Sequence, residues 1–340
     1  MADQGETADR PWVGIAANAH SGVGTGRRRV ELLVQELLGR GLATRVAWTP
    51  AERTALVAGA RDDRGCRCLV AAGGDGTVAA LINERPRAPV TVLPVGTENL
   101  FARHFGLDRR PAYLAATIAG GRVVPLDLGQ VGGRRFALMA GIGFDADVVA
   151  RHHGARVDAG GRMRPTHRAF YIEAVLRSSW NYRFPPLTVT ITDPDGAETL
   201  VGTSLFVFNL PRYALGLPIA PTARGDDGWL DLVVFRDAGP WQALHYLGMV
   251  RLGLHLRMPS VAHRRVRRVV VSSAAAVPVQ LDGDPGGMIA AYEQAGTWTA
   301  EVLPRALDVL VPANYVADEA IESPAGTASR RGSARSPRPG

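Results

Sequence analysis

The sequence contains no lysine, because all 39 of its Lys-plus-Arg positions are arginine. Without a lysine ammonium, the Walker A mode of phosphate binding and Schiff-base chemistry with a carbonyl substrate are both excluded. Cysteine is nearly absent as well. Cys66 and Cys68 lie one residue apart, a spacing that fits neither a disulfide framework nor a zinc site. We interpret these two cysteines as small residues of a buried strand.

Long apolar runs are also missing. No stretch approaches the ~18 uninterrupted apolar residues that a membrane-spanning helix requires. The first residues, MADQGETADR, lack the basic region and apolar region of a secretory signal. We therefore expect a cytoplasmic protein. The net charge of +7 favours anionic partners, among them nucleotide phosphates, nucleic acid and an anionic membrane surface.

The length of 340 residues predicts two domains, and 46% hydrophobic residues supply ample core. Residues 11–121 alternate short β-rich runs with helical segments, which predicts a parallel α/β domain. Residues 122–313 consist mostly of β runs with close turns and two helices. This pattern predicts a mainly antiparallel β domain, a sandwich or partly closed barrel. Residues 320–340 are rich in Pro, Ser, Gly and Arg, and we predict a disordered tail.

The strongest local signal is a glycine-rich loop between an apolar strand and a helix. It consists of Gly73, Gly74, Asp75, Gly76 and Thr77. Glycines let a backbone approach a ligand closely, and the amides of the loop and the helix start form an anion site. Asp75 would repel a bare phosphate, so we expect it beside Mg²⁺ or a substrate hydroxyl. The alternative is a tight turn with an Asp cap on the helix.

Small and hydroxyl residues also follow the other predicted strands of this domain. They are Asn18, Ser21, Gly22 and Gly24 after the first strand, Thr49 after the second, and Gly96, Thr97 and Asn99 after the fourth. An open parallel sheet binds its ligand at the carboxyl ends of its strands. The combined placement therefore predicts one nucleotide site at this edge.

Five motifs in a fixed order resemble the diacylglycerol and sphingosine lipid kinases, above all their soluble bacterial branch, over roughly residues 12–313. They are GGDGT at Gly73–Thr77, PVGTEN at Pro94–Asn99, AGIGFDADV at Ala140–Val148, APTARGDDGWLD at Ala220–Asp231 and LDGDP at Leu281–Pro285. The resemblance implies an enzyme that uses ATP and Mg²⁺ to phosphorylate a lipid hydroxyl. Conversion of diacylglycerol to phosphatidic acid is the first candidate reaction.

The same resemblance implies roles for individual residues. The GGDGT loop, Asn18, Thr49 and Thr97 would hold ATP in a cleft between the two domains. Asp284 stands where the family usually has Glu as the general base, and Asp75 is the alternative base. Asp127 would belong to a magnesium network. A second, structural metal would lie at Asp227 with the backbone carbonyls of Arg224 and Trp229, and the alternative for Asp227 is an Asp-Gly turn.

Besides Asp284, three positions depart from the family pattern. Ala79 and Ala80 replace an Asn-Glu pair, and Leu100 replaces an Asp. These departures leave open a catalytically impaired nucleotide- or lipid-binding protein. An NAD kinase-like phosphotransferase also stays open, because NAD kinases share the GGDGT motif. The GFDA motif and the Asp-Gly motifs of the β domain argue against the NAD kinase. We expect no nucleic-acid partner, because no aromatic and basic platform or helix-turn-helix pattern is present.

Two arginine-rich stretches are candidate contacts with an anionic membrane. They are Arg151–Arg168 and Ser260–Val271. Arginines near such a surface are attracted to its lipid headgroups, which predicts peripheral membrane association. The alternative is that both stretches are solvated loop charges. The sequence leaves a homodimer open.

Overall fold

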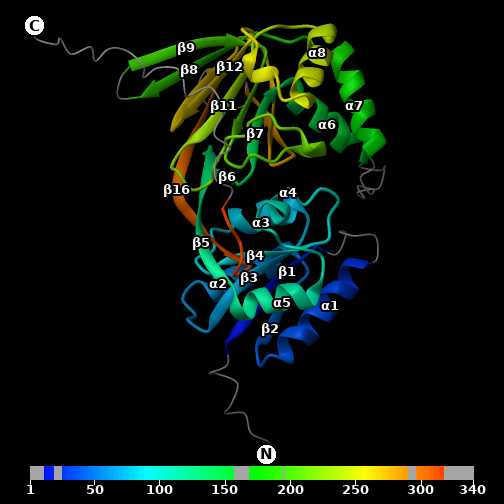
Figure 1. Ribbon diagram of the computed structural model, residues 1–340, viewed down its shortest axis with the longest axis vertical. Coiled ribbons are helices and arrows are strands. Elements are labelled where there is room, and N and C mark those ends of the chain that lie inside the picture. The colour runs from blue at the N-terminus through cyan, green and yellow to red at the C-terminus, as the bar shows by residue number, and fades with distance from the viewer. Residues whose placement is uncertain (1–10, 19–24, 157–167, 194–195, 290–295, 318–340) are drawn as a thin grey trace, which may run out of the picture.

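The computed structural model describes residues 11–18, 25–156, 168–193, 196–289 and 296–317 (Figure 1). The predicted tail at 320–340 lies outside these ranges, and so do Ser21, Gly22 and Gly24 of the first predicted turn. Figure 1 shows an α/β half at the N-terminal end of the molecule and a β-rich half above it.

The α/β half contains a parallel sheet with the strand order β2-β1-β3-β4. Its strands are β1 (Trp12–Ala17), β2 (Ala43–Ala47), β3 (Cys66–Gly73) and β4 (Val90–Pro94). The helices are α1 (Thr25–Leu38), α2 (Pro50–Ala60), α3 (Asp75–Asn83), α4 (Leu100–His104) and α5 (Pro111–Gly120). β1 and β4 are buried along their whole length, as expected for strands covered on both faces. The predicted parallel α/β architecture is confirmed.

The β-rich half is a sandwich of two sheets. A six-stranded antiparallel sheet has the order β12 (Val261–Val266), β11 (Leu230–Phe235), β10 (Ser204–Phe208), β7 (Met139–Gly143), β14 (Pro278–Leu281) and β15 (Asp284–Met288). The opposing sheet contains β16 (Thr297–Val311), β13 (Arg268–Ser272), β8 (Leu187–Asp193), β9 (Gly196–Gly202), β5 (Arg122–Val131) and β6 (Arg134–Phe136). Ile142, Val189 and Trp298 belong to the core between the sheets. The sandwich prediction is confirmed.

Three helices lie at one end of the six-stranded sheet (Figure 1): α6 (Phe144–Arg156), α7 (Arg168–Asn181) and α8 (Pro240–Arg251). Short 3₁₀ turns, η1 (Ala214–Gly216) and η2 (His255–Arg257), complete the described elements. Among the described residues, none of the helices is long and apolar enough to cross a bilayer.

The alternative that both arginine-rich stretches are loops is wrong for most of their described residues. Residues Arg151–Arg156 form the last turns of α6, and residues 157–167 lie outside the described ranges. The second stretch is not a loop either. Val261–Val266 is itself strand β12, because Val261, Ala262 and Val266 are buried and the segment pairs with β11.

The two halves share one continuous sheet, because β16 runs through both of them. Its first part pairs with β13, whereas Val309 near its end pairs in parallel with Val90 of β4. The chain bends at Arg305, which has a positive φ of 50°, and the register against β5 shifts there. The last residues of the predicted β domain therefore complete the sheet of the α/β half.

Asp127 ties this bend to the β-rich half. Its Oδ1 accepts a hydrogen bond from the Arg305 amide at 2.7 Å, and its Oδ2 accepts one from the Gly228 amide at 2.6 Å. The side chain is buried, with 1% of its surface exposed. Asp127 therefore holds together β5, β16 and the turn before β11.

We expect Asp127→Ala to lower the free energy of unfolding by about 2–4 kcal/mol, because two buried amides lose their charged acceptor. Chemical denaturation measures this change. Asp226→Ala is the matched control, since Asp226 forms a half-exposed ion pair with Arg224 and its loss should cost less than about 1 kcal/mol. Equal losses in the two variants would contradict the role of Asp127 as a tie.

Candidate active site

Two loops meet backbone to backbone at the carboxyl edge of the parallel sheet. β3 ends at Gly73 and α3 begins at Asp75, while the second loop follows β4. A Cβ atom on Gly96 would lie only 2.6 Å from the Cα atom of Gly74. A side chain at Gly96 would displace one of the loops, so the close contact depends on glycine.

The carboxylate of Asp75 fastens the two loops together. Its Oδ2 accepts the Leu100 amide and its Oδ1 accepts the Phe101 amide, each at 3.0 Å. Burial raises the pKa of Asp75, and these two hydrogen bonds oppose the rise. Both oxygens of Asp75 are therefore engaged with the start of α4.

Several predicted nucleotide ligands stabilise their own turns. Thr49 is the N-cap of α2, and its Oγ1 accepts the Glu52 amide at 3.2 Å. The buried side chain of Asn99 accepts the Gly96 amide at 2.9 Å and donates to the Gly96 carbonyl at 2.8 Å. Thr77 is buried at the first turn of α3, where its amide donates to the Gly74 carbonyl.

Two other predicted ligands face solvent at the same edge. Asn18 follows β1 and Thr97 lies in the second loop, and both are exposed. Because β2, β1, β3 and β4 are neighbours in the sheet, their following turns lie along one edge. The structure thus brings the described residues of the predicted nucleotide site together.

Asp284 begins β15 directly after a two-residue hairpin turn. The turn residues Asp282 and Gly283 both have positive φ values, 52° and 83°, as a type I′ turn requires. The carboxylate of Asp282 accepts hydrogen bonds from the amides of Ala137, Leu138 and Met139 at 2.8–3.0 Å. Burial nevertheless raises the pKa of Asp282 to about 6. Asp282 therefore anchors the turn that carries Asp284.

The carboxylate of Asp284 reaches the glycine-rich loop of the other half. A Cβ atom on Gly76 would lie 3.5 Å from Oδ2 of Asp284 and 3.9 Å from Oδ1. The predicted base and the predicted phosphate loop are thus in contact range, although they are far apart in the sequence. This contact places the candidate site between the two halves, at α3 (Figure 1).

The two aspartates predicted to contact metals are hydrogen-bonded by protein donors. Asp127, predicted for the magnesium network, accepts backbone amides with both oxygens. Asp227, predicted for the structural metal, accepts the Trp229 amide at 3.0 Å and a hydrogen bond from the Arg265 guanidinium. In the part of the chain that the structure describes, no group of three or more His, Cys, Asp or Glu side chains could hold a metal ion. A site at Asp227 would therefore depend on the backbone carbonyls of Arg224 and Trp229, and it stays a prediction.

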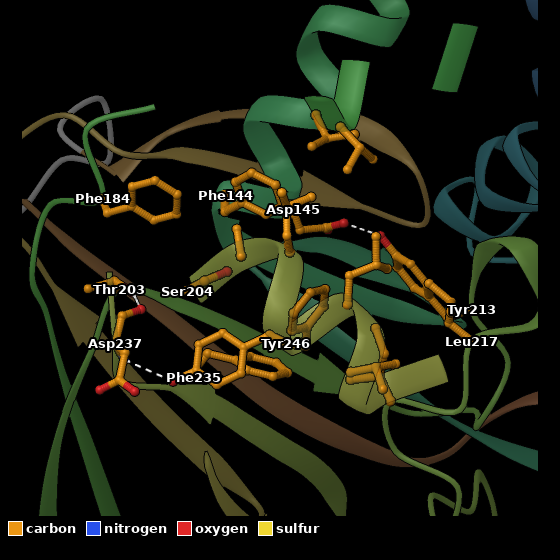
Figure 2. A pocket seen from close by; sticks show the side chains of 18 of the residues that line it. Phe144, Asp145, Phe184, Thr203, Ser204, Tyr213, Leu217, Phe235, Asp237 and Tyr246 are labelled. Atoms are coloured by element: carbon orange, nitrogen blue, oxygen red, sulfur yellow. Dashed lines mark hydrogen bonds between the residues drawn. The ribbon is translucent and has the colours of Figure 1, made fainter. Parts of the chain in front are cut away.

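A largely apolar cavity of about 190 Å³ lies in the β-rich half beneath α8. Figure 2 shows aromatic side chains, among them Phe144, Phe235 and Tyr246, around this cavity. Its polar wall holds Asp145, which accepts a hydrogen bond from the hydroxyl of Tyr213.

Gln280 connects this cavity to the hairpin turn. Its Nε2 donates to Oδ2 of Asp145, and its Oε1 accepts the Gly283 amide, each at 2.8 Å. Asp145 is buried, and this burial raises its pKa to about 6.

Sequence reasoning missed Asp145, Gln280 and Asp282 as site residues. Asp145 and Asp282 lie inside two of the motifs quoted above, so the motifs marked the right segments without showing which carboxylate faces which neighbour. Gln280 directly precedes LDGDP in a strand and carries no signal of its own. Only the pairing of β14 with β7 places it beside Asp145.

The raised pKa of Asp145 predicts a pH dependence of stability. Because the folded-state pKa of about 6 exceeds the ordinary value of 3.8, the folded state binds more protons than the unfolded chain between these values. The contribution of Asp145 to stability is therefore present below pH ~4 and is lost as the pH rises through about 6.

Asp145→Asn removes this titration. We expect the free energy of unfolding of the variant, relative to the unsubstituted protein, to increase by roughly 2–3 kcal/mol between pH 4 and pH 7. Denaturant titrations across this pH range measure the difference. A difference that stays constant with pH would contradict the prediction.

Comparisons with known proteins agree with this architecture. The family model described as the diacylglycerol kinase catalytic domain matches residues 13–131. The model described as the YegS C-terminal NAD kinase beta sandwich-like domain matches residues 140–311. A solved structure described as a diacylglycerol kinase from Bacillus anthracis str. Sterne covers 91% of this chain and 99% of its own, with a TM-score of 0.63 and 17% identity. That likeness concerns the fold.

Curated relatives point to the same family. A "Probable lipid kinase YegS-like" protein of Pseudomonas aeruginosa PAO1 is 30% identical over 262 residues, which are 76% of this chain and 82% of the relative. A diacylglycerol kinase of Bacillus subtilis (strain 168) is 28% identical over 65% of this chain and 72% of its own length. From these matches and the shared two-part fold, we conclude that the chain belongs to the family of the diacylglycerol kinases and YegS-like lipid kinases.

Proposed function

We propose that this protein transfers the γ-phosphoryl group of ATP to a lipid hydroxyl, with diacylglycerol as the first substrate to test. One observation carries the proposal: the Asp284 carboxylate lies beside Gly76 of the glycine-rich loop. The hairpin turn that carries Asp284 is also linked through Gln280 to the apolar cavity. Asp284 thus lies at a candidate phosphate loop, and Gln280 joins its hairpin to Asp145 at the wall of a candidate acyl-chain cavity.

The glycine-rich loop has the features of a phosphate site. The Asp75 and Gly76 amides at the start of α3 have no carbonyl partner within the helix, and they carry the positive end of its dipole. The glycines leave these amides accessible to phosphate oxygens. Arg109 adds a guanidinium at the second loop, where it donates to the Gly96 carbonyl at 3.0 Å. Arg109 thus supplies a positive charge near the loop, a role for which this chain has no lysine.

A phosphate-bound Mg²⁺ fits the loop better than a cage made only of protein ligands. Mg²⁺ commonly binds through one or two carboxylates together with substrate phosphates. The ion would then be held mainly by phosphate oxygens bound at the loop, which leaves the Asp284 carboxylate beside Gly76 for the lipid hydroxyl. When bound, the ion would neutralise the charge on the phosphate oxygens.

The chain's own residues can perform the remaining steps. Asp284 would accept the proton of the lipid hydroxyl while the hydroxyl oxygen bonds to the γ-phosphorus and ADP leaves. Asp75 would keep the two loops in contact through the Leu100 and Phe101 amides. The cavity would hold an acyl chain, with Asp145 and Tyr213 at its polar wall.

This function requires a cytoplasmic enzyme that associates peripherally with a membrane, because ATP is a cytoplasmic substrate and diacylglycerol resides in a bilayer. The test is transfer of labelled γ-phosphate from ATP to a panel of lipids that includes diacylglycerol, with NAD in a parallel reaction. Labelled lipid would support the proposal. Labelled NAD alone would favour the NAD kinase-like alternative, and no labelled product would favour an impaired binding protein.

Asp284→Asn should lower kcat for lipid phosphorylation by ~10²–10⁴, because the general base is lost. The affinity for ATP should stay near that of the unsubstituted protein, since the phosphates bind to the other half. Asp284→Glu should retain activity, because it restores the residue that the family usually carries. Steady-state kinetics with ATP and lipid varied separately distinguish these effects.

Asp75→Asn provides a contrasting variant. The NH₂ group of the new Asn side chain would then face the backbone N–H of Leu100 or Phe101, and one of the two hydrogen bonds that join the loops would be lost. We therefore expect a higher KM for ATP together with a lower kcat.

If Asp284→Asn turned over lipid as fast as the unsubstituted protein, Asp284 would have only a structural role at the start of β15. The base would then have to be sought at Asp75.

A further inference from the structure

Helix α8 is apolar on two opposite faces. Its inner face contributes Tyr246 and Val250 to the cavity. Its outer face carries Trp241, which is 71% exposed, and Leu252, directly after the helix, is 69% exposed. The exposed side of the helix also carries Gln242 and His245, so its apolar surface comes mainly from Trp241 and Leu252. Within the described residues, nothing buries this outer face.

A second exposed tryptophan extends the apolar surface onto α7. Trp180, in the last turn of α7, is 59% exposed and packs edge-on against Trp241 with the ring centroids 5.5 Å apart. α7 and α8 lie side by side in the β-rich half, with α8 at the end far from the α/β half and α7 running along the side toward it (Figure 1). A contiguous exposed patch with large aromatic side chains usually marks an interaction site.

Two arginines without an acidic partner among the described residues lie beside this patch, whereas the exposed Glu173 of α7 is paired with Arg177. Residues 238–281 contain six arginines and no Asp or Glu, but four of the six lie in or directly after β12. Arg251 in the last turn of α8 and Arg257 in η2 are exposed, and neither forms an ion pair with a residue that the structure describes. Arg264 and Arg265 differ, because they pair with Glu198 and Asp227. The nearest acidic residue before α8, Asp237, belongs to the cavity lining.

The patch continues to the rim of the cavity. Leu215 and Leu247 line the cavity and are 39% and 37% exposed, so the cavity reaches the surface beside α8. A molecule that enters here would pass the outer edge of the helix. Tryptophan is enriched at membrane–water interfaces, and arginine is attracted to anionic headgroups. Because the cavity opens beside this surface, a bilayer that contacts the tryptophans and arginines would also lie next to the cavity rim.

We infer that Trp180, Trp241, Leu252, Arg251 and Arg257, here named the α7–α8 surface, dock the protein on an anionic lipid bilayer. The docked protein presents the cavity rim to the membrane. This inference rests on the proposed function, because it identifies how that site would obtain a bilayer substrate. It also assigns membrane contact to a different surface from the paired arginines of β12.

The first test measures binding without ATP or a lipid substrate. The full chain is sedimented with sucrose-loaded vesicles of phosphatidylcholine alone, or of equimolar phosphatidylcholine and phosphatidylglycerol. Trp180→Ala/Trp241→Ala should weaken partitioning onto anionic vesicles about tenfold or more. Arg251→Ala/Arg257→Ala should weaken it by about ten- to thirtyfold, and only on the anionic vesicles.

Matched controls use exposed residues away from this surface. Leu38→Ala/Val201→Ala removes two exposed apolar side chains, and Arg61→Ala/Arg64→Ala removes the same charge from the α/β half. Both controls should bind vesicles like the unsubstituted protein, and thermal unfolding confirms that all variants fold. Unchanged binding of the tryptophan variant, or equal losses in the controls, would overturn the inference.

A second measurement separates docking from catalysis. The tryptophan variant should phosphorylate a short-chain diacylglycerol dissolved as monomers at the unsubstituted rate, while losing turnover of long-chain diacylglycerol in vesicles. Equal loss on both substrates would overturn the docking role. If the unsubstituted protein phosphorylated neither substrate, the proposed function would fail, and the vesicle-binding result would still decide the inference about the surface.

Discussion

The candidate site depends on the carboxylate of Asp282, which is buried in the β-rich half. Asp282 binds three consecutive amides, those of Ala137, Leu138 and Met139. These bonds hold the hairpin between β14 and β15 against the start of β7. Since the hairpin has only two turn residues, its position determines where Asp284 lies relative to Gly76. The contact between the two halves of the site therefore follows from an anchor within the β-rich half.

Buried carboxylates hold the loops and turns of the candidate site in place. Their burial disfavours the charged form. The pKa values of Asp75, Asp145 and Asp282 are all raised by burial, even though each accepts hydrogen bonds from the protein. Such groups reduce stability at neutral pH while they order a site. Asp75 joins the glycine-rich loop to the loop after β4, Asp282 anchors the hairpin that carries Asp284, and Asp145 is linked through Gln280 to that hairpin. The three carboxylates thus hold the loops and the hairpin that meet at the candidate site.

Much of the architecture could be predicted from local pattern. The alternation of strands and helices in the first half, the glycine-rich loop after β3 and the β-rich second half all follow from periodicity and turn residues. The strand β12 was harder to predict, because its exposed arginines interrupt the apolar pattern of the buried Val261 and Val266. The roles of individual carboxylates were harder still to predict from the sequence. Asp127 and Asp227 are plausible metal ligands by motif, yet backbone amides and Arg265 engage them in the fold.

The sequence by itself determined which segments form the candidate site, since GGDGT and LDGDP are short motifs whose backbone conformations depend on their own glycines. Tertiary structure alone decided which of their side chains meet. The Asp284 carboxylate approaches Gly76, Gln280 reaches Asp145, and Trp180 packs on Trp241, in each case between elements far apart in the chain. Local periodicity records only which face of an element is buried. Contacts between distant elements depend on how whole sheets and helices pack, and β16, which runs through both halves, sets that packing.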